Sequence, residues 1–393
     1  MGTFVKKMSV IPMPHRLSIT LSETKSATTA PSLLAVDRAL SDLRRAQIVA
    51  IDNANGLVTL VLAAEGATKS TIQRLKDLSK GQPDLIITAA RAHTLGLGSF
   101  KNKAVRAKMG KALRPDLIES LVNPLAEFSK NDFFDIPFED IDLESGESAA
   151  IGLTKLSRLL PAAITVNLPV DDFKSFISAE NLMGVTNHDI FGYEEAAARS
   201  LRAVSDAQVP LADAPQTKMV AFRPADGGIE HIAIIIGEPN PNEPVLIRIH
   251  SECFTGDLVG SLRCDCGDQL RGAIKAIADH GSGILLYLAQ EGRGIGLINK
   301  LRAYKLQDTG LDTFDANEQL GFDADERVYI PAAQMLDHLG VKQVRLMTNN
   351  PEKVKVLGTC HVDVVERVEH AFETNKHNEP YLFAKATKGG HYL

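Results

Sequence analysis

Apolar and polar positions in the first half of the chain follow two different spacings. Apolar side chains that recur every three or four residues predict helices, and short apolar runs bounded by turn residues predict buried strands. The predicted helices span residues 33–45, 70–78, 153–159 and 171–180. The predicted strands span residues 48–51, 57–63, 84–89 and 162–166. Residues 99–145 are charged and weakly periodic, so the pattern predicts no element there.

The second half alternates in the same way, and its patterns are stronger. The predicted strands span residues 245–249, 283–288 and 344–347. The predicted helices span residues 268–280, 297–307 and 331–339, and a last helix begins at Pro351, because proline is favoured in the first turn. Alternating helices and strands in both halves predict an α+β protein with two mixed α/β domains.

Two stretches lack such a pattern. Residues 1–30 are polar and are predicted to form a flexible leader. Residues 206–217 hold two prolines among small and polar side chains, which is typical of a linker. The predicted organisation is therefore a leader at 1–30, a first domain at 31–207 and a second domain at 208–393.

Composition and charge narrow the class of protein. The chain has 393 residues, 44% hydrophobic and 23% charged, which suits a globular protein with two cores. A net charge of -6 argues against a nucleic-acid-binding surface spread over the chain. No apolar run has the length of a membrane span, and no signal peptide is visible. Four cysteines, three of them clustered, suit a reducing compartment, so we expect a cytoplasmic protein without nucleic-acid or membrane partners.

The cysteine cluster consists of Cys253, Cys264 and Cys266. Three thiolates without a fourth match a catalytic zinc site, which leaves one position open for water or substrate. The N-terminus of the helix predicted at 268–280 would lie beside Cys264 and Cys266, where its dipole favours the thiolate. The alternative is three buried apolar cysteines, but packing alone poorly explains such a cluster in a cysteine-poor chain. The sequence therefore favours a metal site.

Two strand-to-helix turns could bind anions. Residues 290–296, Gln-Glu-Gly-Arg-Gly-Ile-Gly, let backbone N–H groups approach a phosphate, although such a turn alone is a weak signal. Thr348 and Lys353 flank the N-terminus of the last predicted helix, a second anion site. Asp325 and Arg327 lie in a charged run, which composition alone would explain as a solvated face.

Several long motifs follow one another in the second half. They are Arg-Ile-His-Ser-Glu-Cys-Phe-Thr-Gly-Asp at 248–257, Ser-Leu-Arg-Cys-Asp-Cys-Gly at 261–267, Gln-Glu-Gly-Arg-Gly-Ile-Gly-Leu at 290–297, Arg-Ala-Tyr-Lys-Leu-Gln-Asp at 302–308, Gln-Leu-Gly-Phe-Asp-Ala-Asp-Glu-Arg at 319–327 and Leu-Met-Thr-Asn-Asn-Pro-Glu-Lys at 346–353. By these motifs, residues from about 215 to 393 resemble GTP cyclohydrolase II, the zinc enzyme that opens riboflavin biosynthesis.

The resemblance implies a role for each matching residue. Zn²⁺, one per chain, would be held by Cys253, Cys264 and Cys266. GTP would be bound by Arg248, Ile249, His250, Ser251, Glu252, Gln269, Glu291, Gly292, Arg293, Thr313, Thr348 and Lys353. Asp325 would be the proton acceptor, Arg327 the residue that attacks the α-phosphate, and Tyr304 a tyrosine near the purine ring. The family is described as homodimeric, with Mg²⁺ on the GTP triphosphate.

The implied reaction converts GTP to 2,5-diamino-6-(5-phosphoribosylamino)pyrimidin-4-one, formate and pyrophosphate. Two alternatives stay open. A related zinc hydrolase could stop at the formamidopyrimidine or act in pyrimidine catabolism, and a non-enzymatic nucleotide sensor could use the same pocket. The three cysteines together with Tyr304, Asp325 and Arg327 argue against a sensor, which has no need of a reactive centre.

Residues 39–52, 63–65 and 153–164 are similar to 3,4-dihydroxy-2-butanone-4-phosphate synthase, which is often fused ahead of GTP cyclohydrolase II. The family's acidic Arg-Glu-Asn-Glu-Gly-Asp loop is replaced by Asn-Ala-Asn-Gly-Leu-Val at 53–58. Its Gly-His-Thr-Glu-Ala motif becomes Gly-Glu-Ser-Ala-Ala at 146–150, without histidine. The first domain is therefore predicted to be a degenerate synthase-like domain.

These losses predict a scaffold without synthase activity. The synthase reaction on ribulose 5-phosphate needs acid–base groups and a divalent metal held by carboxylate and histidine. His93 and His188 could supply a new site, but a lone histidine is more often structural than catalytic.

Overall fold

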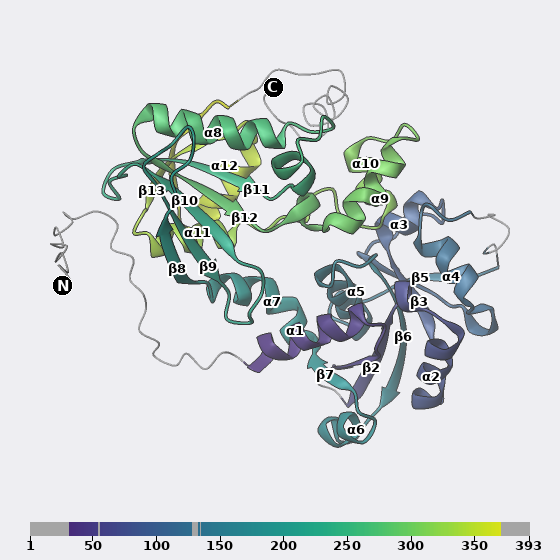
Figure 1. Ribbon diagram of the computed structural model, residues 1–393. Helices are drawn as coiled ribbons and strands as arrows, with labels where there is room; N and C mark the ends of the chain where they lie inside the picture. Colours follow the sequence, from purple (N-terminus) through teal and green to yellow (C-terminus); the bar gives the residue numbers. More distant parts are fainter. Residues whose placement is uncertain (1–30, 54–55, 128–132, 134, 371–393) are drawn as a thin grey trace, which may run out of the picture.

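The computed structural model describes residues 31–53, 56–127, 133 and 135–370. Within these residues the chain forms two seven-stranded sheets, each packed against helices, in two lobes that lie side by side (Figure 1). The predicted class, two mixed α/β domains, is confirmed. The predicted leader at 1–30 lies outside the described residues.

The first sheet has the strand order β5-β4-β3-β6-β2-β1-β7, and its pairs are antiparallel except β1 with β7. Its strands are β1 Val49–Asp52, β2 Leu57–Ala63, β3 Asp84–Thr88, β4 Ala104–Ala107, β5 Phe138–Asp140, β6 Ala162–Pro169 and β7 Met183–Thr186. The helices of this lobe are α1 Pro31–Arg44, α2 Lys69–Ser79, α3 Ala89–Thr94, α4 Pro115–Val122, α5 Gly146–Leu156, α6 Phe173–Ala179 and α7 Asn187–Arg199. β2 contributes buried side chains to separate cores on its two faces, as expected for a strand covered on both sides.

The second sheet has the order β14-β13-β11-β12-β10-β9-β8. Its strands are β8 Arg202–Gln208, β9 Thr217–Arg223, β10 His231–Ile236, β11 Val245–Ser251, β12 Gly283–Leu288, β13 Gln343–Met347 and β14 Asp363–Val368. Its helices are α8 Cys266–His280, α9 Leu297–Gln307, α10 Thr313–Gln319, α11 Ile330–His338 and α12 Pro351–Thr359. β11 to β14 pair in parallel, so the loops after their carboxyl ends gather at one edge, where ligands bind in such sheets.

One hydrophobic core is shared between the two lobes. In sequence α9 and α10 lie between β12 and β13 of the second sheet, but α10, which packs on α9, lies against α3 of the first lobe (Figure 1). The buried side chains that they and their flanking loops add to the first lobe's core are Ile295, Ala303, Leu306, Ala316, Leu320 and Phe322. Because these side chains are apolar and buried there, they hold the two lobes together by the hydrophobic effect.

Most of the predicted elements are confirmed, several of them to within one residue. The linker predicted at 206–217 is wrong in its first part, because residues 206–208 belong to β8, an exposed edge strand paired with β9. The pattern misled because an exposed edge strand needs no apolar alternation. The second sheet thus begins at Arg202, and the domain boundary near residue 208 stays a proposal.

Two further differences concern the first lobe. The helix predicted at 153–159 begins earlier, at Gly146, where Ser145 caps it by accepting a hydrogen bond from the Ser148 N–H. Residues 99–145, for which no element was predicted, contain β4, α4 and β5. None of the helices within the described residues is long and apolar enough to cross a membrane.

Candidate active site

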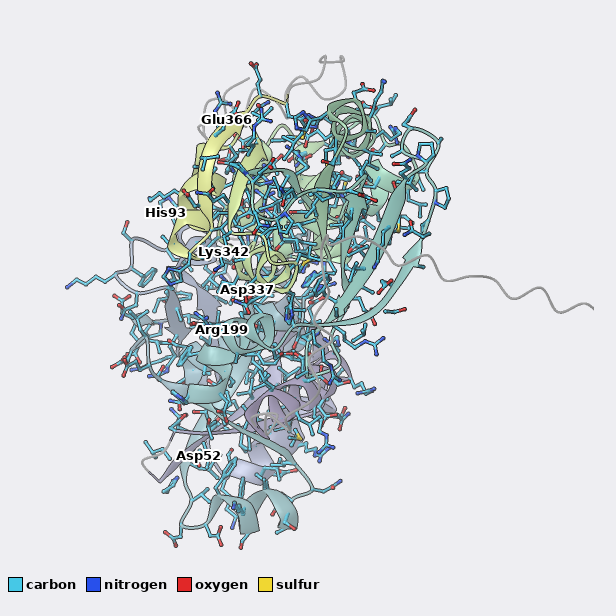
Figure 2. All side chains as sticks on the ribbon, turned by 90° about the vertical axis from the view of Figure 1, so that its left-hand side faces the viewer. Asp52, His93, Arg199, Asp337, Lys342 and Glu366 are labelled. Carbon is cyan, nitrogen blue, oxygen red and sulfur yellow. The ribbon has the colours of Figure 1, made fainter. Side chains whose placement is uncertain are left out.

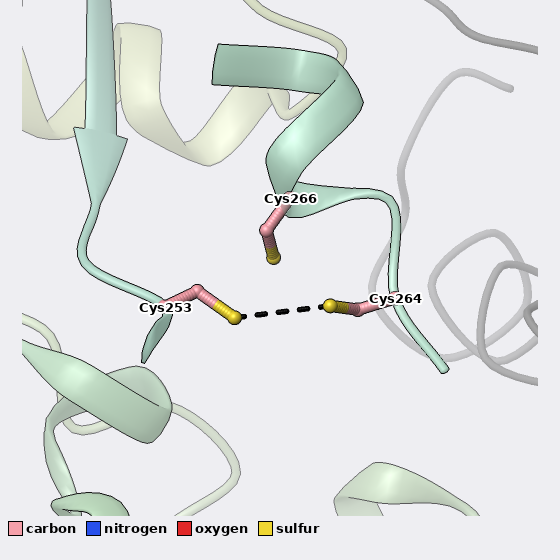
Figure 3. Close-up of side chains that lie close together, drawn as sticks. All are labelled: Cys253, Cys264 and Cys266. Atoms are coloured by element: carbon pink, nitrogen blue, oxygen red, sulfur yellow. Dashed lines mark hydrogen bonds between the residues drawn. The ribbon is translucent and has the colours of Figure 1, made fainter. Parts of the chain in front are cut away.

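Three thiols meet where β11 ends and α8 begins. Cys253 follows β11, Cys266 is the first residue of α8, and Cys264 lies just before it, with the sulfurs facing one another (Figure 3). The Sγ atoms of Cys253 and Cys264 are 3.7 Å apart, and all three lie within 4.8 Å of one another. Tetrahedral thiolates about 2.3 Å from a zinc ion stand about 3.8 Å apart, so this geometry fits a metal site.

The cluster is close-packed because a glycine lies against it. Gly256 belongs to η4, the short π-helix Phe254–Leu258 that leads out of Cys253. A Cβ atom at Gly256 would stand 2.8 Å from Cys264 Sγ and 3.2 Å from Cys253 Sγ. The Gly256 N–H also donates to Cys253 Sγ at 3.4 Å. Any larger side chain there would displace the sulfurs.

A buried carboxylate, Asp257, fixes the groups around Cys253. Asp257 accepts hydrogen bonds from the Cys253 N–H at 3.0 Å and the Tyr287 hydroxyl at 3.0 Å. Both its oxygens lie 3.1 Å from Nε2 of His250, whose ring stacks on Tyr287 with centroids 5.6 Å apart. Burial lowers the pKa of His250. Sequence reasoning gave Asp257 no role, although it ends the motif that contains Cys253.

A buried lysine touches the same cysteine. Lys300 on α9 lies with Nζ 2.9 Å from Cys253 Sγ and 2.9 Å from Glu291 Oε1. Glu291 in turn accepts from the Phe254 N–H at 2.6 Å. Hydrogen bonds from the other two thiols, and next from Lys300, lower the pKa of the Cys253 thiol. Lys300 was missed by sequence reasoning, but its i,i+4 spacing to Tyr304 places both on one helix face and could have identified it.

A cavity opens beside the thiols, and every residue predicted to bind GTP lines it. Those residues are Arg248, Ile249, His250, Ser251, Glu252, Gln269, Glu291, Gly292, Arg293, Thr313, Thr348 and Lys353. Tyr304, Arg327 and the three cysteines line it as well. The cavity thus brings together residues from β11, α8, α9 and α12 and from the loops between them. The individual roles of these residues stay predictions.

Buried cations give the cavity its charge. Arg248 donates to Gln269 Oε1 at 2.5 Å and to the Met347 carbonyl at 3.0 Å, while its Nε is buried with no partner among the described residues. Burial lowers the pKa of Arg248 to about 10, so it stays charged at neutral pH. Lys353 is buried too, and its Nζ donates to the Ile249 carbonyl at 3.1 Å. Buried cations that line a cavity suit an anionic ligand.

The glycine-rich turn has an unusual backbone conformation. In η5, Glu291–Gly294, both Gly292 and Arg293 have positive φ, 65° and 61°. A non-glycine residue rarely adopts this conformation, and such residues cluster at functional sites. A Cβ atom at Gly294 would stand 2.8 Å from the carbonyl oxygen of Glu326, so glycine is needed where these two loops cross.

Of the proposed catalytic pair, Arg327 lines the cavity, whereas Asp325 is not among its lining residues and lies against Arg327. Arg327 donates through Nε to Asp325 at 2.8 and 3.1 Å, and Nη2 also contacts this carboxylate. Burial would raise the pKa of Asp325, but the charge of Arg327 and its hydrogen bonds hold that pKa below the usual value. The guanidinium carbon of Arg263 lies over the Tyr304 ring, 4.9 Å from the ring centroid. Burial raises the pKa of the Tyr304 phenol to about 12. At neutral pH the carboxyl is therefore ionised and the phenol neutral.

Three thiols that could share a metal ion thus lie beside a cationic cavity that suits an anionic small molecule. Residues 202–369 match the family model for GTP cyclohydrolase II. The "GTP cyclohydrolase-2" of Azospirillum brasilense is 50% identical over 364 residues, 92% of this chain and 94% of that protein. That of Pseudomonas aeruginosa is 57% identical over 175 residues, covering 44% of this chain and 85% of the relative. The chain belongs to the GTP cyclohydrolase II family.

The similarity extends through the first lobe. The "Riboflavin biosynthesis protein RibBA" of Synechocystis is 34% identical over 398 residues, 91% of this chain and 71% of that protein. RibBX, a two-domain 3,4-dihydroxy-2-butanone 4-phosphate synthase from A. baumannii, aligns at 15% identity over 86% of this chain and 99% of its own, with a TM-score of 0.35. That score is too low to establish a shared fold. The alignment with RibBA covers both lobes, and the predicted recognition of a synthase-like N-terminal domain is confirmed.

The first lobe carries a polar network of paired side chains where its own site was predicted to be lost. Glu147 is buried, forms an ion pair with Arg106, and accepts from Asn167 Nδ2 at 2.6 Å. Thr59 donates to Asn167 at 2.6 Å and accepts from Asn53 Nδ2 at 3.0 Å. The carboxylate is thus occupied by an internal cation.

The two histidines considered for a new site do not form one. His93 (labelled in Figure 2) and His188 are both exposed, and neither belongs to a group that could share a metal ion. Within the described residues, Cys253, Cys264 and Cys266 form the one group of histidine, cysteine and carboxylate side chains placed to do so.

Proposed function

We propose that this chain is a zinc-dependent GTP cyclohydrolase II, which converts GTP to 2,5-diamino-6-(5-phosphoribosylamino)pyrimidin-4-one, formate and pyrophosphate. The observation that carries the proposal is the cluster of three thiols beside a cavity lined by buried cations. A site with three protein ligands keeps a position for water. The cations suit a triphosphate.

Zinc is the metal that best fits three thiolates at this spacing, because soft sulfur ligands in a tetrahedral set select it. When bound, it would lower the pKa of a water molecule, so that a hydroxide is available at neutral pH to attack C8 of guanine. Asp257 and Lys300 would hold Cys253 in place through its N–H and its sulfur. Such supporting contacts orient metal ligands and tune the metal.

The remaining residues would act on the nucleotide. Arg293, Arg327 and Lys353 would bind the triphosphate and stabilise charge that develops on the α-phosphoryl group, together with Mg²⁺. Pairing with Arg327 keeps Asp325 ionised, the form in which a carboxylate can accept a proton. Tyr304, a neutral phenol in the cavity, would donate a hydrogen bond near the purine ring. The homodimer and the cytoplasmic location stay predictions.

Product analysis tests the reaction. The purified full chain is incubated with GTP, Mg²⁺ and Zn²⁺, and the products are identified by mass spectrometry. We expect formate and pyrophosphate in equal amounts with the diaminopyrimidine phosphate. Accumulation of a formamidopyrimidine without formate would instead identify a hydrolase that stops after ring opening, and bound but unchanged GTP would identify a sensor.

A metal measurement tests the site independently. We expect about one zinc per wild-type chain, and Cys264→Ser should lose both the metal and formate release, because a serine hydroxyl is a poor ligand in a thiolate site. Cys360→Ser is the matched control, since Cys360 lies outside the cluster and the cavity. A Cys264→Ser protein that is zinc-free and fully active would refute the metal assignment.

A further inference from the structure

The segment Phe322–Val328 joins the two lobes at the active site. It carries Asp325 and Arg327, and it begins with Phe322, which is buried in the core of the first lobe. The position of this segment depends on its contacts with the first lobe and with the second lobe. The contacts on the two sides come from different halves of the chain.

On the side of the second lobe, the glycine-rich turn holds the segment. The Glu326 N–H donates to the Arg293 carbonyl at 3.1 Å, and the Val328 N–H donates to Gln290 Oε1 at 3.2 Å. Arg293 Nη1 also reaches the Ala324 carbonyl at 3.4 Å. These contacts fix the segment through its backbone.

On the other side, the first lobe holds it through side chains. Lys155, in the last turn of α5, donates to Glu326 Oε1 at 2.7 Å. The same oxygen accepts the Asp323 N–H at 2.7 Å, so Lys155 and the turn share one carboxylate. Lys155 Nζ also lies 3.6 Å from Asp323 Oδ2, and Lys103 Nζ lies 3.0 Å from that oxygen.

The ion pair between Lys155 and Glu326 is less exposed to solvent than an ordinary surface pair. The side chains of Lys155 and Glu326 are 21% and 20% exposed, so water screens the pair less than it does at the open surface. Glu326 stands between Asp325 and Arg327 in sequence, and its side chain pairs with Lys155 of the first lobe. A shift of Glu326 would therefore move both neighbours.

We propose that the N-terminal domain acts as a positioning domain for the cyclohydrolase reaction, with Lys155 as its positioning residue. Lys155 holds Glu326, and thereby keeps Arg327, which lines the cavity, and its partner Asp325 in place. A displacement of about 1 Å at such a group is enough to cost up to a hundredfold in rate. The inference rests on the proposed function, and it assigns the first lobe a task in catalysis that needs no chemistry of its own.

The test compares three lysine variants of the full chain. Lys155→Met removes the charge at similar volume, Lys155→Arg keeps it, and Lys174→Met on the exposed face of α6 is the matched control. We expect Lys155→Met to lower kcat for pyrophosphate release about tenfold. KM for GTP and the zinc content should stay within about twofold of wild type, and the unfolding midpoint within about a few degrees. Lys155→Arg should retain most of kcat, and Lys174→Met all of it.

A second measurement does not depend on turnover. Amide hydrogen exchange in residues 322–328 should be about tenfold faster in Lys155→Met than in wild type, and unchanged in Lys174→Met. If Lys155→Met has the same kcat and the same amide exchange rates in residues 322–328 as wild type, the inference is overturned. A loss of activity that runs parallel to lost zinc or a lower unfolding midpoint would also overturn it, since Lys155 would then be merely structural. A wild-type protein that does not hydrolyse GTP would refute the proposed function alone, and the exchange result would still decide the role of Lys155.

Discussion

At the scale of single residues, the contacts of Arg327 require the planar shape of a guanidinium. Its guanidinium forms a two-pronged contact with Asp325 and lies at the cavity, 5.9 Å from the ring centroid of Tyr329. A planar fork can hold a carboxylate with one edge and reach a phosphate with the other, whereas an ammonium is a point charge. This geometry makes arginine and lysine unequal here.

We therefore expect Arg327→Ala to abolish pyrophosphate release, a loss of at least about a hundredfold, while zinc content stays at the wild-type level. Arg327→Lys should recover little of it. Pyrophosphate assays and metal analysis check both, with Arg345→Ala as the control, because Arg345 pairs with Glu366 on the surface outside the cavity. Near-normal turnover in Arg327→Ala would show that the assignment is wrong.

His231 contacts the chain directly before the glycine-rich turn, so the protonation of its imidazole bears on the stability of this region. Its Nδ1 accepts the Ala289 N–H at 3.0 Å, directly before the glycine-rich turn. Burial lowers its pKa to about 4, below the unfolded value near 6.5. The folded state therefore binds this proton less readily, so the stability from neutral His231 is complete above about pH 6.5 and falls as the pH drops toward 4.

The prediction is a difference between two stability profiles. His231→Gln keeps an acceptor but does not titrate, so its free energy of unfolding should fall less than that of wild type between pH 6.5 and 4. Urea denaturation at a series of pH values measures both curves. If the two curves stay parallel over this range, His231 does not contribute the expected dependence.

At the scale of elements, the cysteine cluster depends on how η4 meets the start of α8. α8 places Cys266 in its first turn, and η4 brings Gly256 against the sulfurs of Cys253 and Cys264 and the Cβ atom of Cys266. Both elements are set by local sequence, but their contact is tertiary. The cluster is therefore sensitive to bulk at Gly256, a residue that is not itself a ligand.

Gly256→Ala should lower zinc affinity about tenfold or more, because its Cβ would stand inside normal contact distance of two sulfurs. Gly192→Ala in α7 is the control, since a Cβ there meets nothing within 4 Å and alanine stabilises a helix by about 0.5–1 kcal/mol. Competition with a chelator measures the affinities. Equal affinity in Gly256→Ala and wild type would contradict this account of the cluster.

At the scale of the whole molecule, we expect the first lobe to act as a scaffold without synthase activity. Glu147 is held by Arg106 and Asn167, so the carboxylate nearest the expected synthase site is already paired and buried. We expect the full chain to release no formate from ribulose 5-phosphate and Mg²⁺. Formate detected above an enzyme-free blank would show that the lobe retains its chemistry.

Much of this protein was determined by local sequence. Apolar runs such as those of β12 and α9 predicted these elements with their correct bounds, because a buried strand and an amphipathic helix each carry their own spacing. The cysteine cluster was equally visible, since two of its members lie within one turn of each other at the start of α8. The long motifs identified the family for the same reason.

Only the tertiary structure decided the rest. Asp257 ends one of the long motifs and Lys300 lies between two of them, but their contacts with Cys253 depend on where η4 and α9 pack. The exposed edge strand β8 left no apolar pattern to read. The ion pair between Lys155 and Glu326 joins residues 171 positions apart, and the local sequence around a lysine does not identify its partner in another lobe. Long-range contacts are set by how the lobes share one core, and no local spacing encodes that.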